Sequence, residues 1–411
     1  MRRHRHKLCQ SVLSENGFGF VPGNHVTLLH NGDAYFPAIE AAIDRARHEI
    51  YLVTYIYEND DTGQRIADAL KRAVLRGVKV HVLIDGFGSK DLPQSMLDRL
   101  RADGVQALVY RPQISPWTFR RKRLRRMHRK IVAVDRKIAF VGGINIIDDR
   151  NKGGDLAPRY DFSVAVEGPL ADVIRLSAKR LCSLVAWRSF RARTGRDVAL
   201  PAATSAGGHI SAAFFVRDNF RHRRDIEVAY LRAIALAESE IILANAYFLP
   251  GIEFRHALIR AAERGVRVIL MLQGQVEYPL EHYAARALYG SFLDGGVEIY
   301  EYNTSFLHAK VAVVDGHWAT VGSSNIDPFS LLLSREANVV IDDEAFGASL
   351  AQELKMTAET ECHRILADNW KRQPACLRFI SWLSYGFLRL MMGISGYASE
   401  SRWAAPARKK K

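Results

Sequence analysis

A histidine and a lysine two positions apart occur twice in this sequence, and the same spacing of acid, glycine and asparagine follows each pair. The first copy consists of His128, Lys130, Asp135, Gly142, Gly143 and Asn145, and the second of His308, Lys310, Asp315, Gly322, Ser323 and Asn325. An imidazole beside an ammonium group, supported by an amide and by small residues in a tight loop, is suited to bind and attack a phosphate. Because the pattern is duplicated without a gap, it predicts one active site shared by two similar units.

Each copy is expected to fold as a strand, a turn, a second strand and a loop. Residues 131–134 and 311–314 are rich in β-branched side chains, and residues 138–141 and 318–321 resume the strand pattern after a turn. Residues two apart on a strand share a face, so the histidine and the lysine of each copy are predicted to point the same way. The aspartate of each copy stands at the turn, and we interpret it as a residue that holds the site without contacting phosphorus.

The sequence around the motifs alternates strand and helix patterns in the same order in both units. Helical spacing of apolar residues covers residues 36–46, 66–74, 228–235 and 253–264, and strand patterns cover residues 50–57, 78–84, 241–248 and 266–272. Arg-Gly-Val-Lys-Val at 76–80 matches Arg-Gly-Val-Arg-Val at 264–268. The alternation predicts an α/β fold of two similar halves, each a mixed sheet flanked by helices.

The duplication and a turn-rich stretch between the halves divide the chain. Residues 199–208 are small and turn-forming, as expected of a boundary. We predict a basic N-terminal tail (1–24), a first half (25–195), a linker (196–208), a second half (209–366) and an apolar, basic C-terminal segment that associates with a membrane (367–411).

Composition and charge limit the class of protein. The chain of 411 residues is 48% hydrophobic, which is enough for a sizeable core and excludes wholesale disorder. Its formal net charge of +14 predicts an anionic partner, either a phospholipid surface or nucleic acid, with solubility alone as the alternative. The four cysteines lack metal-ligand spacing and are expected to be free thiols in a reducing compartment. The basic N-terminus is not followed by the apolar stretch of a cleaved signal peptide.

Two further segments predict contact with an anionic surface. Residues 120–130 form a basic run that leads into the first motif, beside the aromatic segment 114–119. This pairing favours anion steering, although a solvated face and nucleic-acid binding remain open. Residues 377–397 are apolar, but Arg378 and Arg389 interrupt them, so the uninterrupted stretch is shorter than the roughly 20 residues of a spanning helix. An interfacial anchor fits this pattern, and a helix packed on the core is the alternative.

The duplicated motif resembles the signature of the phospholipase D superfamily, H-x-K-x(4)-D-x(6)-G-[GS], which is present here twice. Longer stretches resemble bacterial cardiolipin synthases of the B type, namely residues 126–132, 244–248, 317–325 and 336–339. The resemblance covers residues 25–345. It implies that the two halves pack face to face, with the motifs meeting at their interface.

The chemistry that the resemblance implies is phosphodiester transfer in two displacements, without a metal. One histidine attacks phosphorus to give a phosphohistidine, and the other protonates the departing alcohol and later deprotonates the incoming hydroxyl. By family analogy His128 is the nucleophile and His308 the acid and base, although sequence symmetry alone does not distinguish them. Lys130, Lys310 and the two asparagines would stabilise charge on the phosphoryl oxygens.

Two acidic residues outside the motifs are candidates to orient the histidines. Glu336, eleven residues after Asn325, resembles the downstream acid of the family that orients a histidine. The first half offers Asp161 at a different spacing, sixteen residues after Asn145, and this departure leaves its role open.

We therefore expect a cardiolipin synthase, a phosphatidyltransferase that joins two phosphatidylglycerol molecules and releases glycerol. The alternatives are a phospholipase D that uses water, a nuclease or other phosphodiesterase of the superfamily, and a lipid-binding scaffold without activity. No cofactor is expected, and no metal, because carboxylates at ligand spacing are missing and the lysines repel cations. The expected partners are phosphatidylglycerol and the membrane surface, with nucleic acid disfavoured by the apolar C-terminal segment. This predicts a peripheral protein of the bacterial inner membrane, on its cytoplasmic side.

Overall fold

The computed structural model describes residues 19–112, 126–150, 158–188, 207–218, 222–327 and 334–394. Several expectations concern residues outside these ranges. They are the tail up to residue 18, the aromatic segment and the basic run up to residue 125, most of the linker, and the C-terminal residues after 394.

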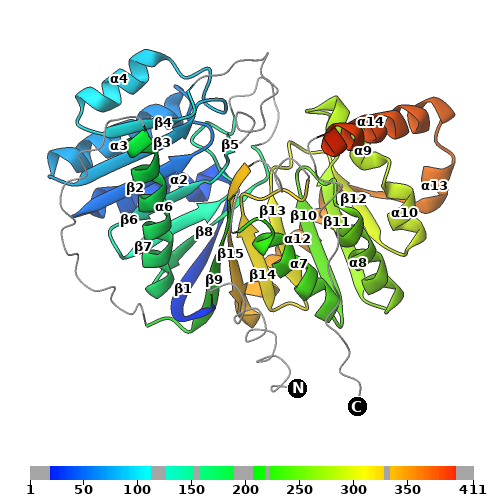
Figure 1. Cartoon of the computed structure of the whole chain (residues 1–411). Helices are drawn as coiled ribbons and strands as arrows, with labels where there is room; N and C mark the ends of the chain where they lie inside the picture. Colours follow the sequence, from blue (N-terminus) through cyan, green and yellow to red (C-terminus); the bar gives the residue numbers. More distant parts are fainter. Residues whose placement is uncertain are drawn as a thin grey trace.

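One continuous sheet of sixteen strands runs through both halves (Figure 1). The first half contributes β1 (Val21–His30), β2 (Glu49–Thr54), β3 (Lys79–Asp85), β4 (Gln106–Tyr110), β5 (Arg126–Met127), β6 (Ile131–Val134), β7 (Ile138–Gly142) and β8 (Phe162–Glu167). The second contributes β9 (Ile210–Arg217), β10 (Glu240–Asn245), β11 (Arg267–Gln273), β12 (Glu298–Tyr302), β13 (Lys310–Val314), β14 (Trp318–Gly322), β15 (Ser334–Asp342) and β16 (Cys362–Ile365).

The strand order is the same in both halves when each is read outward from the middle of the sheet. It runs β1-β8-β7-β6-β2-β3-β4 in the first half and β9-β15-β14-β13-β10-β11-β12 in the second, where β16 adds an edge strand. In each half the outer strands β2-β3-β4 and β10-β11-β12 are parallel, and the remaining pairs are antiparallel. The prediction of an α/β fold with two similar mixed-sheet halves is therefore confirmed.

The halves meet along a seam in the middle of the sheet. Strands β1 and β9 pair antiparallel there, with Val21 opposite Ala212 and Asn24 opposite Ile210. A second contact joins β5 of the first half to β15 of the second, where Met127 lies opposite Arg335. Because β5 directly precedes the first motif, the seam brings this motif beside the second half.

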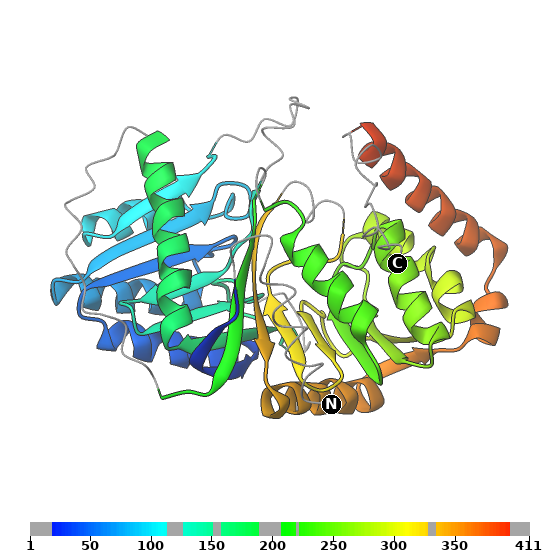
Figure 2. The same cartoon turned by 60° about the horizontal axis from the view of Figure 1, so that its bottom comes forward.

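Helices cover both faces of the sheet, and three hydrophobic clusters fill the space between them. One face of the first half carries α2 (Asn31–Arg45), α3 (Asp61–Leu75) and α4 (Gln94–Ala102), and one face of the second carries α7 (Asp225–Leu236), α8 (Ile252–Glu263), α9 (Pro279–Arg286) and α10 (Tyr289–Asp294). The opposite faces carry α6 (Pro169–Arg188) and α12 (Glu344–Thr360) (Figure 2). Apolar side chains of α6 and α12 belong to a single cluster that spans both halves. This shared cluster joins the two halves across the middle of the sheet.

The helices and strands predicted from periodicity are present, with one systematic difference. Strands β2 and β10 end at Thr54 and Asn245, three residues before the predicted ends at Tyr57 and Phe248. Beyond these ends the chain leaves the sheet and runs beside the motif loops, where Tyr57 and Phe248 form isolated bridges to Ile146 and Ile326. The apolar pattern of the sequence therefore extends past the ends of both strands, into residues that lie beside the motif loops.

The C-terminal segment forms α13 (Ala367–Lys371) and a long helix, α14 (Ala375–Ile394), at the edge of the second half (Figure 1). Leu388 is 2% exposed and belongs to the core cluster beneath α7–α10, and α14 packs against α9. The opposite side of α14 presents exposed apolar side chains, among them Phe379, Trp382 and Leu383. In the part of the chain that the structure describes, no helix has the length and apolarity to cross a membrane.

Candidate active site

The aspartates of the two motifs anchor turns at equivalent places. Asp135 and Asp315 adopt positive φ angles of 52° and 50°, in the left-handed region that Asp tolerates better than most residues. The Asp135 carboxylate accepts hydrogen bonds from the backbone N–H groups of residues 47–49, and the Asp315 carboxylate from those of residues 238–240. Each aspartate thus ties the turn after β6 or β13 to the start of the neighbouring strand, β2 or β10.

Each motif histidine hydrogen-bonds to a carboxylate supplied by the other half. His128 Nδ1 lies 3.1 Å from Glu336 Oε2, and His308 Nδ1 lies 2.6 Å from Asp161 Oδ2. All four side chains are largely or fully buried. The carboxylate fixes each ring and favours the tautomer with hydrogen on Nδ1, which leaves the lone pair on Nε2.

Backbone contacts explain why the acids cross between the halves. His128 N–H donates to Arg335 O at 3.0 Å, beside Glu336. His308 N–H donates to Tyr160 O at 2.8 Å, beside Asp161. The segments that carry each histidine and its acid are therefore fixed together by the main chain as well as by the side chains.

Each acid lies against a small residue of a motif, Asp161 against Gly143 and Glu336 against Ser323. A Cβ atom at Gly143 would lie 2.2 Å from Asp161 Oδ1, so a side chain there would displace the acid. At the equivalent position, Ser323 Oγ donates to Glu336 Oε2 at 2.6 Å. The two halves therefore support their acids differently, one by leaving space and the other by a hydrogen bond.

The two motif lysines are buried, and this changes their protonation. Lys130 and Lys310 are 2% and 0% exposed, and each Nζ donates to the backbone oxygen of the histidine two residues before it. Burial lowers the pKa of Lys130 to about 7 and that of Lys310 to about 8, although the nearby carboxylates Glu336 and Asp161 favour the charged form. A bound phosphodiester would supply the negative charge that makes both ammonium groups stable.

The histidines are also held in the neutral form. Burial lowers the pKa of His128, and Glu336 only partly offsets it. Burial, followed by Lys310 and Arg159, holds the pKa of His308 well below its ordinary value. Burial raises the pKa of Asp161 to about 6, because desolvation outweighs the nearby cations. The groups immediately around the two histidines thus carry little negative charge, which suits the binding of an anionic phosphate at that point.

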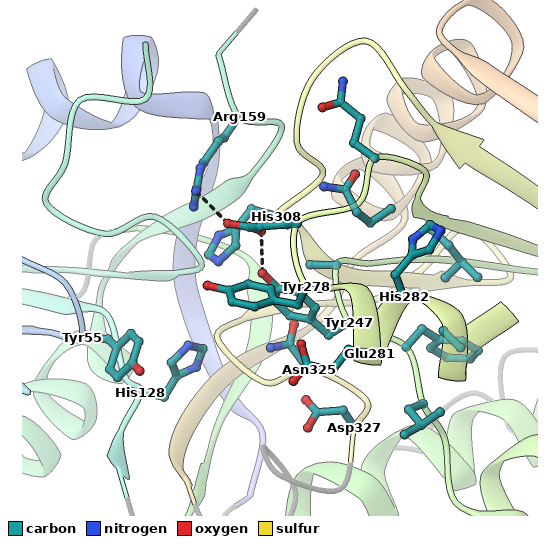
Figure 3. A pocket seen from close by; sticks show the side chains of 18 of the residues that line it. Tyr55, His128, Arg159, Tyr247, Tyr278, Glu281, His282, His308, Asn325 and Asp327 are labelled. Carbon is teal, nitrogen blue, oxygen red and sulfur yellow. Dashed lines mark hydrogen bonds and ion pairs between the residues drawn. The ribbon is translucent and has the colours of Figure 1, made fainter. Parts of the chain in front are cut away.

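Both histidines open onto one cavity of about 320 Å³ (Figure 3). Asn145 and Asn325 line it as well, and Asn145 Oδ1 accepts a hydrogen bond from Ile56 N–H. The lysines, Asp135, Asp315, Gly143, Ser323 and Glu336 do not line this cavity. A volume of this size is at the small end of ligand sites, and the site it forms lies between the halves.

Further cavity residues come from outside the motifs. Tyr55 packs edge-on against His128, with ring centroids 4.7 Å apart. Arg159 Nη2 lies 3.1 Å from Glu277 Oε1, and Tyr247 donates its hydroxyl hydrogen to Glu277 Oε2 at 2.7 Å (Figure 3). Tyr247 falls in residues 244–248, a stretch singled out by sequence resemblance, whereas nothing in the sequence distinguished Glu277. Within the described ranges, no three His, Cys, Asp or Glu side chains are grouped so that they could hold a metal ion.

Comparison with protein families and curated sequences gives a consistent result. The family model described as "Cardiolipin synthase, PLD-like domain" matches residues 39–153 and 230–358. Cardiolipin synthase B of Escherichia coli K12 is 39% identical over 378 residues, which cover 91% of this chain and 90% of that protein. Cardiolipin synthase B of Salmonella typhimurium LT2 is also 39% identical, over 92% and 91% of the two chains. Cardiolipin synthase A of Yersinia pseudotuberculosis is 29% identical over 94% of this chain and 79% of that protein.

Solved structures with a similar fold are more distant in sequence. The phosphatidylserine synthase of Haemophilus influenzae superposes with a TM-score of 0.67 at 14% identity, over 96% of this chain and 98% of that one. The polyphosphate kinase of Porphyromonas gingivalis gives 0.54 at 14% identity, over 90% of this chain and 53% of that one. At such identities the likeness concerns the fold.

Proposed function

Because this chain belongs to the cardiolipin synthase family with a phospholipase D-like domain, we propose that it transfers a phosphatidyl group between two phosphatidylglycerol molecules and releases glycerol. The observation that carries this proposal is the pair of histidines on one cavity, each oriented by a carboxylate of the other half. A nucleophile and a separate acid–base group, both preset by hydrogen bonds, are what a double displacement at phosphorus requires.

In the first displacement, His128 Nε2 forms a bond to the phosphorus of the donor lipid. The bond from phosphorus to the oxygen of the headgroup glycerol breaks at the same time. The lowered pKa of His128 keeps this nitrogen unprotonated and nucleophilic. His308 donates its proton to the departing glycerol oxygen. The negative charge of the bound phosphodiester, with Asp161, favours the imidazolium form of His308 that this step needs.

In the second displacement, the hydroxyl group of another phosphatidylglycerol attacks the phosphohistidine. Its oxygen bonds to phosphorus, the bond from phosphorus to His128 breaks, and His308 accepts the hydroxyl proton. Lys130 and Lys310, charged once the phosphate is bound, would stabilise the phosphoryl oxygens together with the amide groups of Asn145 and Asn325. Asp135, Asp315, Gly143, Ser323 and Glu336 act by holding these groups in place.

Helix α14 supports a peripheral location at a membrane, and we propose that this is the inner membrane, on its cytoplasmic side. Its exposed side carries Phe379, Trp382, Leu383, Phe387 and Leu390, with exposed fractions of 49–67%. These positions recur at helical spacing on one side of α14 and form an apolar surface that suits the headgroup–acyl boundary of a bilayer. Anionic lipids such as phosphatidylglycerol complement the net charge of +14.

Turnover of phosphatidylglycerol in detergent micelles, without added metal, tests the proposal. We expect cardiolipin and free glycerol from the wild type, and neither product from His128→Ala or His308→Ala. Circular dichroism of the two variants is the control for folding. Phosphatidic acid as the sole lipid product would identify a phospholipase D, and cleavage of DNA without any lipid product would identify a nuclease.

A further inference from the structure

The two halves differ in the residue that lies beside each histidine. Strands β2 and β10 occupy equivalent places, and their registers with β6 and β13 put Tyr55 and Ala246 at equivalent positions just past the strand ends. The Tyr55 ring covers the His128 side of the site, whereas the Ala246 side chain is a single methyl group in the cavity wall. The space in this site therefore lies on the His308 side.

The wall on this side is supplied almost wholly by the second half, and it combines apolar side chains such as Phe248 and Leu272 with hydrogen-bonding groups. They include Gln273, Glu277, Tyr278, Glu281 and Asp327. Glu277 is held by Arg159 and Tyr247. The Nε2 atom of Gln273 is buried and has no hydrogen-bond acceptor among the described residues, so this wall offers a donor as well as carboxylate acceptors.

The carboxylates of this wall favour hydroxyl groups over anions. Hydroxyl hydrogens bond to carboxylate oxygens, whereas a second carboxylate or phosphate brought beside them is repelled. Burial raises the pKa of Glu281 to about 7, with smaller effects of Asp327 and Glu277 in the same direction. Because Asp327 and Glu277 add to this rise, a further negative charge brought beside Glu281 is disfavoured.

We propose that this part of the cavity is the subsite for the alcohol headgroup, and that Glu281 and Ala246 determine its specificity. The subsite holds the donor glycerol as it leaves and then the hydroxyl-bearing headgroup of the acceptor, beside His308. The proposal rests on the function proposed above and defines its acceptor class: uncharged polyols and amino alcohols are used, and hydroxy acids are excluded. Ala246 provides the room, and the carboxylates provide the selectivity.

The fate of the phosphohistidine reports on this subsite directly. An alcohol oxygen or a water oxygen bonds to phosphorus, the bond from phosphorus to His128 breaks, and His308 takes the proton in either case. The alcohol uses the subsite, whereas water does not need it. The ratio of phosphatidyl alcohol to phosphatidic acid is therefore independent of how fast the phosphohistidine forms, and a general loss of activity does not change it.

The test measures this ratio by mass spectrometry with phosphatidylglycerol as donor and three soluble acceptors: deuterated glycerol, 2-amino-1,3-propanediol and glycerate. We expect the wild type to prefer the first two over glycerate by about tenfold or more, as for hydrogen bonds to a charged group. Glu281→Gln should reduce this preference about tenfold. Ala246→Tyr should lower the ratio of phosphatidyl alcohol to phosphatidic acid with every acceptor. Glu263→Gln, an exposed change on α8, is the matched control and should behave as the wild type.

If Glu281→Gln and Ala246→Tyr both give the same product ratios as the wild type, the proposal of this subsite is wrong. If the wild type forms no phosphatidyl product of any kind, the proposed function fails instead. The subsite is then decided by saturation-transfer NMR of glycerol and glycerate with the wild type and Glu281→Gln. A preference for glycerol that the variant loses supports the subsite, and equal binding of the two compounds by both proteins overturns it.

Discussion

Each histidine of the repeated motif takes its orientation from an acid of the other half, and each lysine is buried by the same packing. Lys130 and Lys310 have no access to water in which to place an ammonium group, and their hydrogen bonds to backbone oxygens compensate only in part. Burial therefore shifts the lysines and the histidines towards their neutral forms. In the proposed mechanism the anionic lipid changes this balance, which couples substrate binding to the protonation that the reaction requires.

The buried lysines predict that stability rises with pH. The pKa of Lys130 is lowered from 10.5 to about 7, so between these values the unfolded chain binds a proton that the folded chain does not. Because the unfolded state binds more protons in this range, the free energy of unfolding increases with pH. Below the folded-state pKa both states bind the proton, so this increase is absent. Between about pH 7.5 and 9.5, the free energy of unfolding measured with urea should increase by about 2 kcal/mol more for the wild type than for Lys130→Met.

Lys137→Met is the matched control, because that lysine of the Asp135 turn is exposed, and it should retain the wild-type pH dependence. Parallel curves for the wild type and Lys130→Met would show that Lys130 titrates in the folded protein as it does in the unfolded chain.

The sequence singled out the motif residues as candidates, because the spacing of each histidine and lysine indicates their chemistry. The role of Asp161 was not predictable, since its spacing from the first motif differs from that of Glu336 in the second. The structure resolves this difference: Gly143 leaves space for the short Asp161 side chain, whereas Ser323 hydrogen-bonds to the longer Glu336. The correspondence between Tyr55 and Ala246 was also missed, because it depends on strand registers.

At the scale of elements, periodicity located the strands and helices of both halves but not the residues where two central strands end. The apolar runs through Tyr57 and Phe248 were predicted as strand throughout. These side chains are buried outside the sheet, against the motif loops, and a strand pattern does not distinguish the two kinds of burial. The C-terminal helix shows the reverse case, in which an apolar pattern belongs to an exposed surface.

The exposed side of α14 predicts binding to vesicles. Trp382 is 67% exposed, and burying such a side chain in a bilayer contributes about 1.5–3 kcal/mol. Trp382→Ser should therefore weaken binding to phosphatidylglycerol vesicles by about tenfold or more in a sedimentation assay. Met356→Ser, which changes an exposed apolar residue on α12, is the control and should bind as the wild type. If both variants bind equally well, α14 is not the membrane contact.

The same helix packs on α9, whose residues Glu281 and His282 belong to the cavity wall. A membrane bound to the outer side of α14 would thus lie one helix away from the proposed headgroup subsite. This arrangement would place the lipid source and the proposed headgroup subsite on the same half of the molecule.

At the scale of the whole molecule, the seam makes the site a property of both halves together. The β1–β9 pairing and the backbone bonds of His128 to Arg335 and of His308 to Tyr160 bring distant segments into one sheet and one cavity. The duplication was evident in the sequence, and family resemblance placed the motifs at an interface. The continuous sheet was not predictable, because the strands that form the seam carry no signal for their partners.

The seam within one chain predicts how inactive variants behave when they are combined. His128 and His308 of the same chain line one cavity, so a chain that lacks either histidine cannot be completed by a second chain that keeps it. Coexpressed and copurified His128→Ala and His308→Ala proteins should therefore form no more cardiolipin than either variant alone. Each site in such a mixture still has only one histidine, and the double displacement needs two.

Recovery of a substantial fraction of wild-type activity would mean that the site forms between chains, with the seam strands exchanged in a dimer. Separate tags on the two variants, followed by tandem purification, ensure that any activity belongs to mixed assemblies and not to unmixed wild-type contaminants.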